Sequence, residues 1–287
     1  MRPMKLKAHE VKLIWGSEAW LLSARANAES TTEAGLGLGE LFARQPELFG
    51  TKSADCKDFP LLIKFIDARD DLSVQVHPRD EDTHVLQPGE AGKTECWYIL
   101  DAAPGAKLYL GFREAITQEQ FAQAIADGTL MEHVQAFDVR PDDFFYMPAG
   151  TLHAIGKGVF LAEVQQNSDT TYRVFDYNRL QNGAPRELHV DQALAVTKLV
   201  PYMHVPPTSE VLVQNEMFTV RKLGGADGFS DKAKEDSFVS LVIIEGAGKL
   251  SCSDESIAVR KGDSVFIPAG TGEYRMTGDC VALATSL

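Results

Sequence analysis

The sequence predicts a mainly β protein that is built from two related β-units. Short runs of β-branched and aromatic residues, bounded by Gly, Pro and Asp, follow one another along most of the chain. In addition, VRPDDFFYMPAGT at 139–151 recurs as VRKGDSVFIPAGT at 259–271, an offset of 120 residues, with Val, Arg, Asp, Pro, Ala, Gly and Thr identical. Because such a repeat marks a duplicated structural unit, we expect two copies of one β-structure.

The strand pattern occurs on both sides of a proline pair. The runs cover 62–67, 72–78, 96–101, 107–112, 143–149, 159–166, 218–223, 237–246 and 264–270. Pro206 and Pro207 separate the first six runs from the last three, and prolines of this kind interrupt regular structure. We therefore expect a first domain over residues 1–204 and a second over residues 205–287.

Helical patterns are few and short. The clearest begins at Thr117, an N-cap residue with Gln120 three positions later, and ends at Gly128. It lies in an insertion over about residues 112–137 of the first unit. A second helix is predicted near residues 189–199, in HVDQALAVTKL. Residues 31–49 have a weaker helical pattern, because glycines interrupt it.

Composition indicates a globular protein that does not bind nucleic acid. The 287 residues are 44% apolar and 24% charged, and the net charge of −13 includes no Lys/Arg-rich run. The four cysteines form no CxxC pair, so we expect reduced thiols. No apolar stretch reaches the length of a membrane span, and the first twenty residues lack the apolar segment of a signal peptide. We expect a cytoplasmic protein.

Four residues have the spacing of a metal site: Gln75, His77, Glu95 and His153. Gln75 and His77 are two apart in an alternating run, so both side chains point to one face of a strand. The Pro148-Ala149-Gly150 turn places His153 at the start of another strand. Two imidazoles, a carboxylate and an amide oxygen suit zinc, or less selectively Mn, Fe or Co. A histidine on a strand is more often structural, and that alternative remains open for both.

Three longer stretches closely resemble one enzyme family. They are PLLIKFIDARDDLSVQVHPRDED at 60–82, GKTECWYIL at 92–100 and PAGTLHAIGKGVFLAEVQQNSDTTYRVFDYNR at 148–179. In this order they resemble the short bacterial form of type I mannose-6-phosphate isomerase, a zinc enzyme of the cupin superfamily. The match runs from about Asp58 to Arg186, and DTTYR is much more specific than a general cupin motif.

The resemblance implies both a fold and an activity. Each β-unit would be a cupin-type barrel, or jelly roll, with the small helical insertion in the first. The activity would be a metal-dependent interconversion of mannose 6-phosphate and fructose 6-phosphate through a cis-enediol. The implied cofactor is one Zn²⁺ per chain, held by Gln75, His77, Glu95 and His153.

The resemblance also implies further site residues. Arg173 matches the catalytic arginine of the family, and Glu163 and Lys93 fall at positions that line the same pocket. Ser73 and Arg179 match positions on the phosphate side. Arginine is too weak an acid to lose its proton easily, so we expect Arg173 to stabilise enediolate charge or to shuttle protons beside a carboxylate.

Two of these residues have a structural alternative. Glu163 lies ten residues from both His153 and Arg173, and it is either the base or the ion-pair partner of Arg173. Lys93 either faces the pocket with Glu95, two residues later, or points to solvent from the loop after Gly92.

The expected partner is a small-molecule sugar phosphate, with no nucleic acid and no membrane. Because the chain is acidic, the phosphate needs a local basic cluster, for which Lys93, Arg173, Arg179 and Arg186 are candidates. Any one of these residues taken alone is more often a solvated surface charge. We expect a monomer or a homodimer.

Two other functions compete with the isomerase. Cupins also include iron oxygenases, but these need open coordination positions for O₂, to which a glutamine ligand and an arginine cluster are poorly matched. A non-catalytic sugar-binding cupin is the other alternative. In either case the second unit has no equivalent metal site, because Glu273 stands opposite His153 in the repeat and no histidine follows His204.

Overall fold

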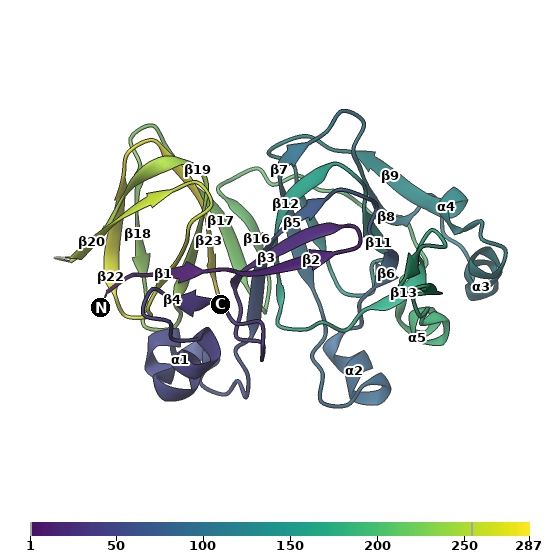
Figure 1. The fold of residues 1–287 in the computed structure, drawn as a ribbon, viewed down its shortest axis with the longest axis horizontal. Coiled ribbons are helices and arrows are strands. Elements are labelled where there is room, and N and C mark those ends of the chain that lie inside the picture. Colours follow the sequence, from purple (N-terminus) through teal and green to yellow (C-terminus); the bar gives the residue numbers. More distant parts are fainter. Residues whose placement is uncertain (1, 254) are drawn as a thin grey trace. The chain divides into compact units, whose positions relative to one another are not determined.

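A computed structural model describes residues 2–253 and 255–287, and strands dominate it (Figure 1). The mainly β prediction is confirmed, while the closed-barrel form of both units stays a prediction. The chain forms two compact units. The first comprises Met1–Glu10, Ala19–Lys64 and Pro207–Leu287, and the second comprises Val11–Glu18 and Phe65–Pro206.

This division differs from the expected domains at the N-terminal end of the chain. Strand β1 (Met4–Lys7) pairs with β21 (Ser264–Ile267) and with β4 (Thr31–Thr32). Residues 1–10 and 19–64 are therefore grouped with the C-terminal strands rather than with residues 65–206. Hydrogen bonding between strands more than 250 residues apart has no signature in a local pattern.

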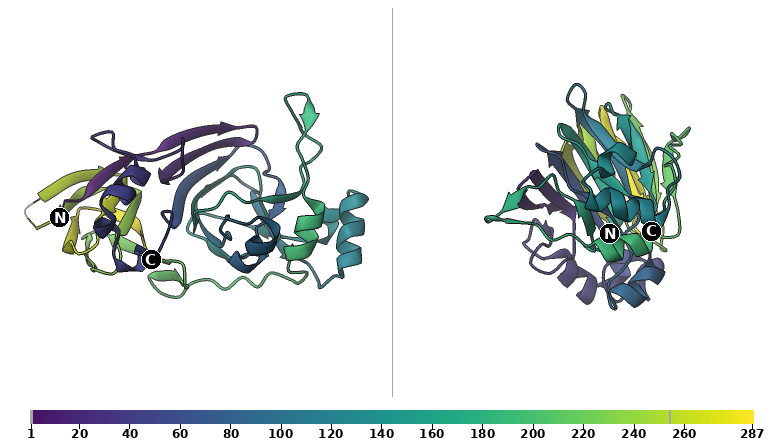
Figure 2. Two further views of the ribbon diagram at one scale, coloured as in Figure 1. Left: turned by 90° about the horizontal axis from the view of Figure 1, so that it is seen from below. Right: turned by 90° about the vertical axis from the view of Figure 1, so that its right-hand side faces the viewer.

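The second unit consists of two facing sheets (Figures 1 and 2). One sheet has the order β10-β7-β12-β5-β3-β2, and the other has the order β13-β6-β11-β8-β9. Strands β2, β3 and β5 of the first sheet each cross a boundary between the two units in the sequence. The strands are β2 His9–Leu13, β3 Gly16–Leu22, β5 Leu61–Ala68, β6 Val74–Val76, β7 Glu95–Ala102, β8 Lys107–Phe112, β9 Val134–Asp138, β10 Phe144–Met147, β11 His153–Ile155, β12 Val159–Gln166 and β13 Tyr172–Phe175. Ile99 and Leu161 from one sheet pack with Leu108 and Leu110 from the other, so a core lies between the sheets.

Helices cover the outer face of the five-stranded sheet. Val74 and Val76 point away from the inner face and pack with apolar residues of α3 (Gln118–Ala126), α4 (Leu130–His133) and α5 (Val190–Val196) (Figure 1). The predicted helices near 117–128 and 189–199 are thus confirmed.

The capping box of α3 is complete. The Thr117 amide donates to Gln120 Oε1 at 2.8 Å, and the Gln120 amide donates to Thr117 Oγ1 at 3.2 Å.

The polar DEDTH segment at 80–84 has the composition of a turn, and this interpretation of the sequence needs correction, while the helical prediction for 31–49 needs refinement. The polar DEDTH segment forms helix α2 (Asp80–Leu86), because the Asp82 carboxylate accepts from both the amide and the Nε of Arg79 at 3.0 Å. Residues 31–49 form only the short helix α1 (Leu38–Arg44) and the 3₁₀ turn η1 (Pro46–Phe49) after β4. Another 3₁₀ turn, η2 (Thr51–Ser53), follows.

Within the part of the chain that is described, no helix is long and apolar enough to cross a bilayer.

The first unit is a sheet that includes the three C-terminal runs. Its main path is β16-β17-β23-β19-β21-β1-β4, with β18, β20 and β22 attached at the side. These strands are β16 Val211–Gln214, β17 Thr219–Gly225, β18 Phe229–Ala233, β19 Val239–Cys252, β20 Glu255–Arg260, β22 Gly272–Thr277 and β23 Cys280–Ser286. Alternate residues of β19, such as Leu241 and Ile243, form its core together with Val265 and Ile267 of β21.

The sequence repeat is also a structural repeat. Strands β10 and β21 occupy positions 120 residues apart, and the loops before and after them form matching hydrogen bonds. The Arg140 amide donates to Asp143 Oδ2 at 3.0 Å, as the Arg260 amide does to Asp263 Oδ2 at 2.9 Å. After the strands, Thr151 Oγ1 and Thr271 Oγ1 each donate to the carbonyl of the proline three residues earlier, at 2.7 and 2.6 Å.

Candidate metal and substrate site

Three of the predicted site residues form one row across the inner face of the five-stranded sheet. Gln75 on β6 is the register partner of His153 on β11 and of Arg173 on β13. Directly opposed residues of antiparallel strands project to the same side, so the three side chains share one face. The row connects residues that are almost one hundred positions apart in the sequence.

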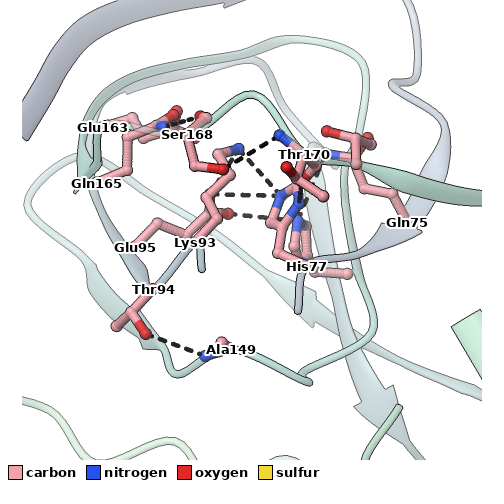
Figure 3. A network of polar contacts seen from close by, with 12 residues as sticks. Gln75, His77, Lys93, Thr94, Glu95, Ala149, Glu163, Gln165, Ser168 and Thr170 are labelled. Carbon is pink, nitrogen blue, oxygen red and sulfur yellow. Dashed lines mark hydrogen bonds and ion pairs between the residues drawn. The ribbon is translucent and has the colours of Figure 1, made fainter. Parts of the chain in front are cut away.

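His77 and Glu95 complete the site beside this row (Figure 3). His77 Nε2 lies 3.5 Å from Glu95 Oε2, and His153 Nε2 lies 3.3 Å from Glu95 Oε1. The three side chains are at most 2% exposed, and one donor atom from each lies within 4.8 Å of the others. Among the described residues, this is the one His/Cys/Asp/Glu group with the geometry to hold a metal ion.

Backbone carbonyls set the tautomer of both imidazoles. His77 Nδ1 lies 2.8 Å from the Thr170 carbonyl, and His153 Nδ1 lies 2.9 Å from the Thr151 carbonyl. A carbonyl only accepts, so each Nδ1 carries the proton and each Nε2 presents a lone pair towards Glu95. Burial, followed by the charge of Lys93, also lowers the pKa of His153 to about 4, which keeps the ring neutral. This arrangement fits a divalent metal ion.

Gln165 and Ser168, which no sequence motif indicated, hold the loop that carries the Thr170 carbonyl. The buried Gln165 donates from Nε2 to the carbonyls of Gln166 and Ser168, at 2.8 and 2.7 Å (Figure 3). Ser168 Oγ in turn accepts from the Thr170 amide at 3.2 Å. These three bonds come from glutamine and serine side chains that belong to no recognised motif, so no sequence pattern predicted them.

Lys93 faces the site, not the solvent. Its Nζ lies 2.9 Å from Glu95 Oε2 and 3.0 Å from His77 Nε2, and the residue is only 6% exposed. An ammonium group has no lone pair, so it donates to His77 Nε2, which agrees with the tautomer above. A positive charge therefore already stands between two of the candidate ligands.

The amide nitrogen of Gln75, not its oxygen, points toward His153. Its Nε2 lies 3.5 Å from His153 Nε2, while its Oε1 accepts from Ser73 Oγ at 3.3 Å. A half-turn of the amide exchanges the two atoms and directs the oxygen at the same position. The structure therefore places the Gln75 amide beside His153, and its role as a ligand stays a prediction.

Glu163 lies deeper along the inner face of β12. Its Oε2 accepts from Trp97 Nε1 at 2.8 Å, and the residue is 2% exposed. The Trp97 ring meets the His153 ring edge-on, with centroids 5.3 Å apart. Within the described residues, Arg173 forms no ion pair with Glu163, so the structure does not bring together the pair considered as the alternative role.

Arg173 extends from the row towards the surface. Its Nε donates to Ser73 Oγ at 3.2 Å, and its Nη1 donates to the Glu187 carbonyl at 2.9 Å. Burial, followed by the charge of Arg186, lowers the pKa of the guanidinium, which nevertheless stays protonated at neutral pH. His153, Gln75, Ser73 and Arg173 thus form a continuous chain of contacts.

The predicted basic cluster is divided between two places. Lys93 belongs to the metal-like group, whereas Arg179 and Arg186 bind the carboxylate of Asp176. Asp176 was not singled out from the sequence, although its spacing in FDYNR, three residues before Arg179, was a usable signal. Burial alone raises the pKa of this carboxyl, but the hydrogen bonds from Arg186 and Arg179 outweigh it and lower the pKa.

Comparison with known proteins gives the family of this chain. Residues 13–98 match the model described as phosphomannose isomerase type I, catalytic domain, and residues 208–286 match the mannose-6-phosphate isomerase cupin domain. The chain is 37% identical over 280 residues to mannose-6-phosphate isomerase ManA of Bacillus subtilis, which covers 92% of this chain and 88% of that protein. The chain belongs to the type I phosphomannose isomerase family.

Solved structures agree with membership of the type I phosphomannose isomerase family. The crystal structure of the mannose 6-phosphate isomerase from Bacillus subtilis has a TM-score of 0.91 and 32% identity, with 100% of both chains covered. A zinc-bound mannose 6-phosphate isomerase, 16% identical, has a TM-score of 0.82 over 99% of each chain, which is a likeness of fold. The resemblance inferred from the sequence is confirmed.

The two family matches do not include every residue of the site. Gln75, His77 and Glu95 lie within the catalytic-domain match at 13–98, whereas His153 and Arg173 lie between the two matches. These two residues join the others through the order of the strands in the five-stranded sheet.

Proposed function

We propose that this member of the type I phosphomannose isomerase family is a zinc-dependent mannose-6-phosphate isomerase. It would interconvert mannose 6-phosphate and fructose 6-phosphate through a cis-enediol. The observation that carries the proposal is the group of two imidazole Nε2 atoms and one carboxylate, beside a row of residues that includes the partly buried Arg173. The relationship to ManA, 37% identical and named as this enzyme, supports the substrate.

We assign one zinc ion per chain to Gln75, His77, Glu95 and His153. Imidazole nitrogen, carboxylate oxygen and amide oxygen together suit a catalytic zinc ion with space for a further oxygen ligand. The carbonyls of Thr170 and Thr151 hold the two rings in the tautomer that ligation requires. When bound, the ion supplies fixed positive charge that polarises the oxygens of the substrate.

Arg173, Glu163 and Lys93 handle charge and protons in this proposal. The Arg173 guanidinium stabilises the negative charge of the enediolate, since it keeps its proton and has a planar set of donors. Glu163 is a buried carboxylate outside the proposed ligand set, and it binds the indole that packs against His153, so we assign to it the removal of the proton at C1 or C2. The indole of Trp97 orients its carboxylate.

Lys93 balances the charge of the ligand set. Its Nζ donates to Glu95 Oε2 and to His77 Nε2. With zinc on His77 Nε2, Lys93 would keep the bond to Glu95 and be a second positive group near the substrate oxygens. The phosphate of the substrate would lie at the corner formed by Ser73, Arg173 and Arg179, on the side of the row away from His153.

A coupled assay on metal-stripped protein tests the proposal. We expect no conversion of mannose 6-phosphate after chelation, and recovery when zinc, manganese or iron is added back, with zinc bound at one ion per chain. Tight binding of mannose 6-phosphate without turnover under any metal would contradict an enzyme and favour a sugar-binding protein. Oxygen uptake with iron would favour an oxygenase.

A further inference from the structure

The three arginines near Asp176 differ in how many of their nitrogen donors are bound to the protein. All three nitrogens of the Arg179 guanidinium donate hydrogen bonds to protein atoms. Its Nε donates to the Asp176 carbonyl at 3.3 Å, its Nη1 to the Asp71 carbonyl at 2.5 Å, and its Nη2 to Asp176 Oδ1 at 2.5 Å. The guanidinium also lies over the Tyr177 ring, 5.3 Å from its centroid. A ligand at Arg179 would have to displace these bonds.

Arg186 and Arg173 each keep a donor group. Arg186 binds Asp176 through Nε at 2.7 Å and Nη2 at 2.5 Å, and among the described residues nothing accepts from its Nη1. Arg173 uses Nε and Nη1 on Ser73 and on the Glu187 carbonyl, and in the described chain its Nη2 likewise donates to no protein atom. Both side chains are therefore held in a fixed orientation and have nitrogen donors available.

The two residues share a pocket that Arg179 does not line. The cavity has a volume of about 370 Å³, and its walls include Arg173, Arg186, Gln181 and Asn182. Its outer wall is the hairpin of β14 (Leu180–Gln181) and β15 (Ala184–Pro185), which stands away from the sheets (Figure 2, left). Asn182 and Gly183 at the tip have φ of 55° and 85°, as a tight two-residue turn requires.

The charges around the cavity favour an anion. Arg173, Arg186 and the acidic Glu187 line the pocket, whereas Asp70 pairs with Arg179 outside the lining. The buried carboxylate of Asp176 binds both Arg179 and Arg186. The charged residues of the lining are thus two arginines against one glutamate, which is a net positive charge in a chain whose net charge is −13. Planar guanidinium groups bind phosphate through paired, charge-assisted hydrogen bonds.

We infer that Arg186, together with Arg173, contacts the phosphate of the substrate directly, and that Arg179 and Asp176 act as positioning residues for Arg186. The inference rests on the proposed function for the identity of the ligand, and at the phosphate corner it replaces Arg179 by Arg186 as the direct contact. Asp176 binds Arg186 in a bidentate pair, and Arg179 holds Asp176 from the other side. Arg186 directly follows the hairpin, whose residues form one wall of the pocket.

Inorganic phosphate is the probe that tests this assignment, because its binding to the zinc-loaded protein can be measured by calorimetry without any turnover. We expect Arg186→Gln to weaken phosphate binding about tenfold or more, the size expected for a lost charge-assisted hydrogen bond. The KM for mannose 6-phosphate should rise by a similar factor while kcat changes little. Inhibition by unphosphorylated mannose should be unchanged, which a merely structural role of Arg186 would not produce.

Matched variants separate the direct contact from general effects. Arg179→Gln should weaken phosphate binding by less than about threefold, and Arg140→Gln, which makes the same charge change at an exposed loop, should leave it unchanged. If Arg186→Gln does not fold, Arg186→Lys retains a charge that can pair with Asp176, and we expect phosphate binding several-fold weaker than in the native protein. Native phosphate affinity in the soluble Arg186 variants, or a larger loss in Arg179→Gln, would overturn the assignment.

The outcome also distinguishes the two proposals. A native protein that binds phosphate through Arg186 but does not convert mannose 6-phosphate would contradict the proposed function alone. A native isomerase whose phosphate affinity and KM do not depend on Arg186 would contradict only this inference.

Discussion

At the scale of single residues, backbone carbonyls decide the chemistry of the site. Thr170 and Thr151 each accept from an imidazole Nδ1 and leave the Nε2 lone pairs of His77 and His153 directed at Glu95. A histidine with the other tautomer has no lone pair at that position and binds no metal there. The donor set therefore depends on main-chain atoms as much as on the ligand side chains.

We predict that His77→Ala or His153→Ala loses bound zinc and isomerase activity together, because removing one of four ligands leaves a weak site. Metal content by mass spectrometry and turnover of mannose 6-phosphate measure this. His84→Ala on α2 is the control, since His84 lies outside the metal-like group. A His77 or His153 variant that keeps both zinc and activity at native levels would disprove the ligand assignment.

Arg173 offers a second test at this scale. Arg173→Lys keeps a charge but loses the planar donor set that contacts Ser73 and the Glu187 carbonyl. If the residue acts in the transition state, kcat should fall on the order of 10²-fold, the typical loss for a charge-stabilising group, with zinc content and Tm unchanged. An effect confined to KM would make Arg173 a phosphate anchor only, and a kinetically normal variant would refute both roles.

At the scale of elements, local signals and strand order make different contributions. Helix α3 begins where its capping box begins, and that box is contained within four residues of sequence. The row of His153, Gln75 and Arg173 instead requires β11, β6 and β13 to be neighbours in one sheet. The first kind of feature can be read locally, and the second depends on register.

Thr117→Ala should destabilise the protein by about 1 kcal/mol, the usual effect of losing an N-cap side chain. Denaturant unfolding of the native protein and the variant measures the difference. Thr117→Ser keeps the hydroxyl and should unfold like the native protein. Equal stability of the alanine variant would mean that α3 does not depend on its cap.

The second copy of the β-unit leads to a prediction about metal. Glu273 on β22 stands 120 residues after His153, is exposed, and is not part of the metal-like group of the described residues. Glu273→Ala should therefore leave zinc at one ion per chain. Loss of a metal ion in this variant would show that the second copy carries a site of its own.

At the scale of the whole molecule, each unit has its own buried core and its own polar interactions. In the unit with the C-terminal strands, Asp231 accepts from Arg221 Nη1 at 3.1 Å and Nη2 at 2.5 Å, and also from Tyr274 Oη at 2.5 Å. Burial raises the pKa of Asp231, but these hydrogen bonds outweigh it, so the net pKa is lowered. A lowered carboxyl pKa stabilises the fold above the pKa of the unfolded chain, and this stabilisation is lost as the pH falls through the folded pKa.

Asp231→Asn should lower the free energy of unfolding by about 2 kcal/mol at pH 7, because Arg221 loses its charged partner in a partly buried position. The difference from the native protein should shrink as the pH falls from about 4, the pKa of an aspartate in the unfolded chain, through the lower pKa of Asp231 in the folded protein. Denaturant titrations at several pH values measure both effects. A difference that is independent of pH would mean that the charge of Asp231 contributes no stability.

The sequence by itself determined the mainly β character, the duplicated loop and strand, helices α3 and α5, and the identity of the donor residues around Glu95. Each of these depends on alternation, capping, turn residues or a motif within a short stretch of chain, or on direct comparison of two such stretches. Local physical chemistry is sufficient to specify them.

Only the tertiary structure decided the rest. In the folded protein β1 pairs with β21, and Lys93 points into the site. The Thr170 carbonyl accepts from His77, and Asp176 binds both Arg179 and Arg186. The physical reason is that strand register and loop packing bring together atoms from distant parts of the chain, and the free energy of those contacts is absent from any local segment. Residue types predicted which groups could bind a metal ion or an anion, and the fold determined which of them meet.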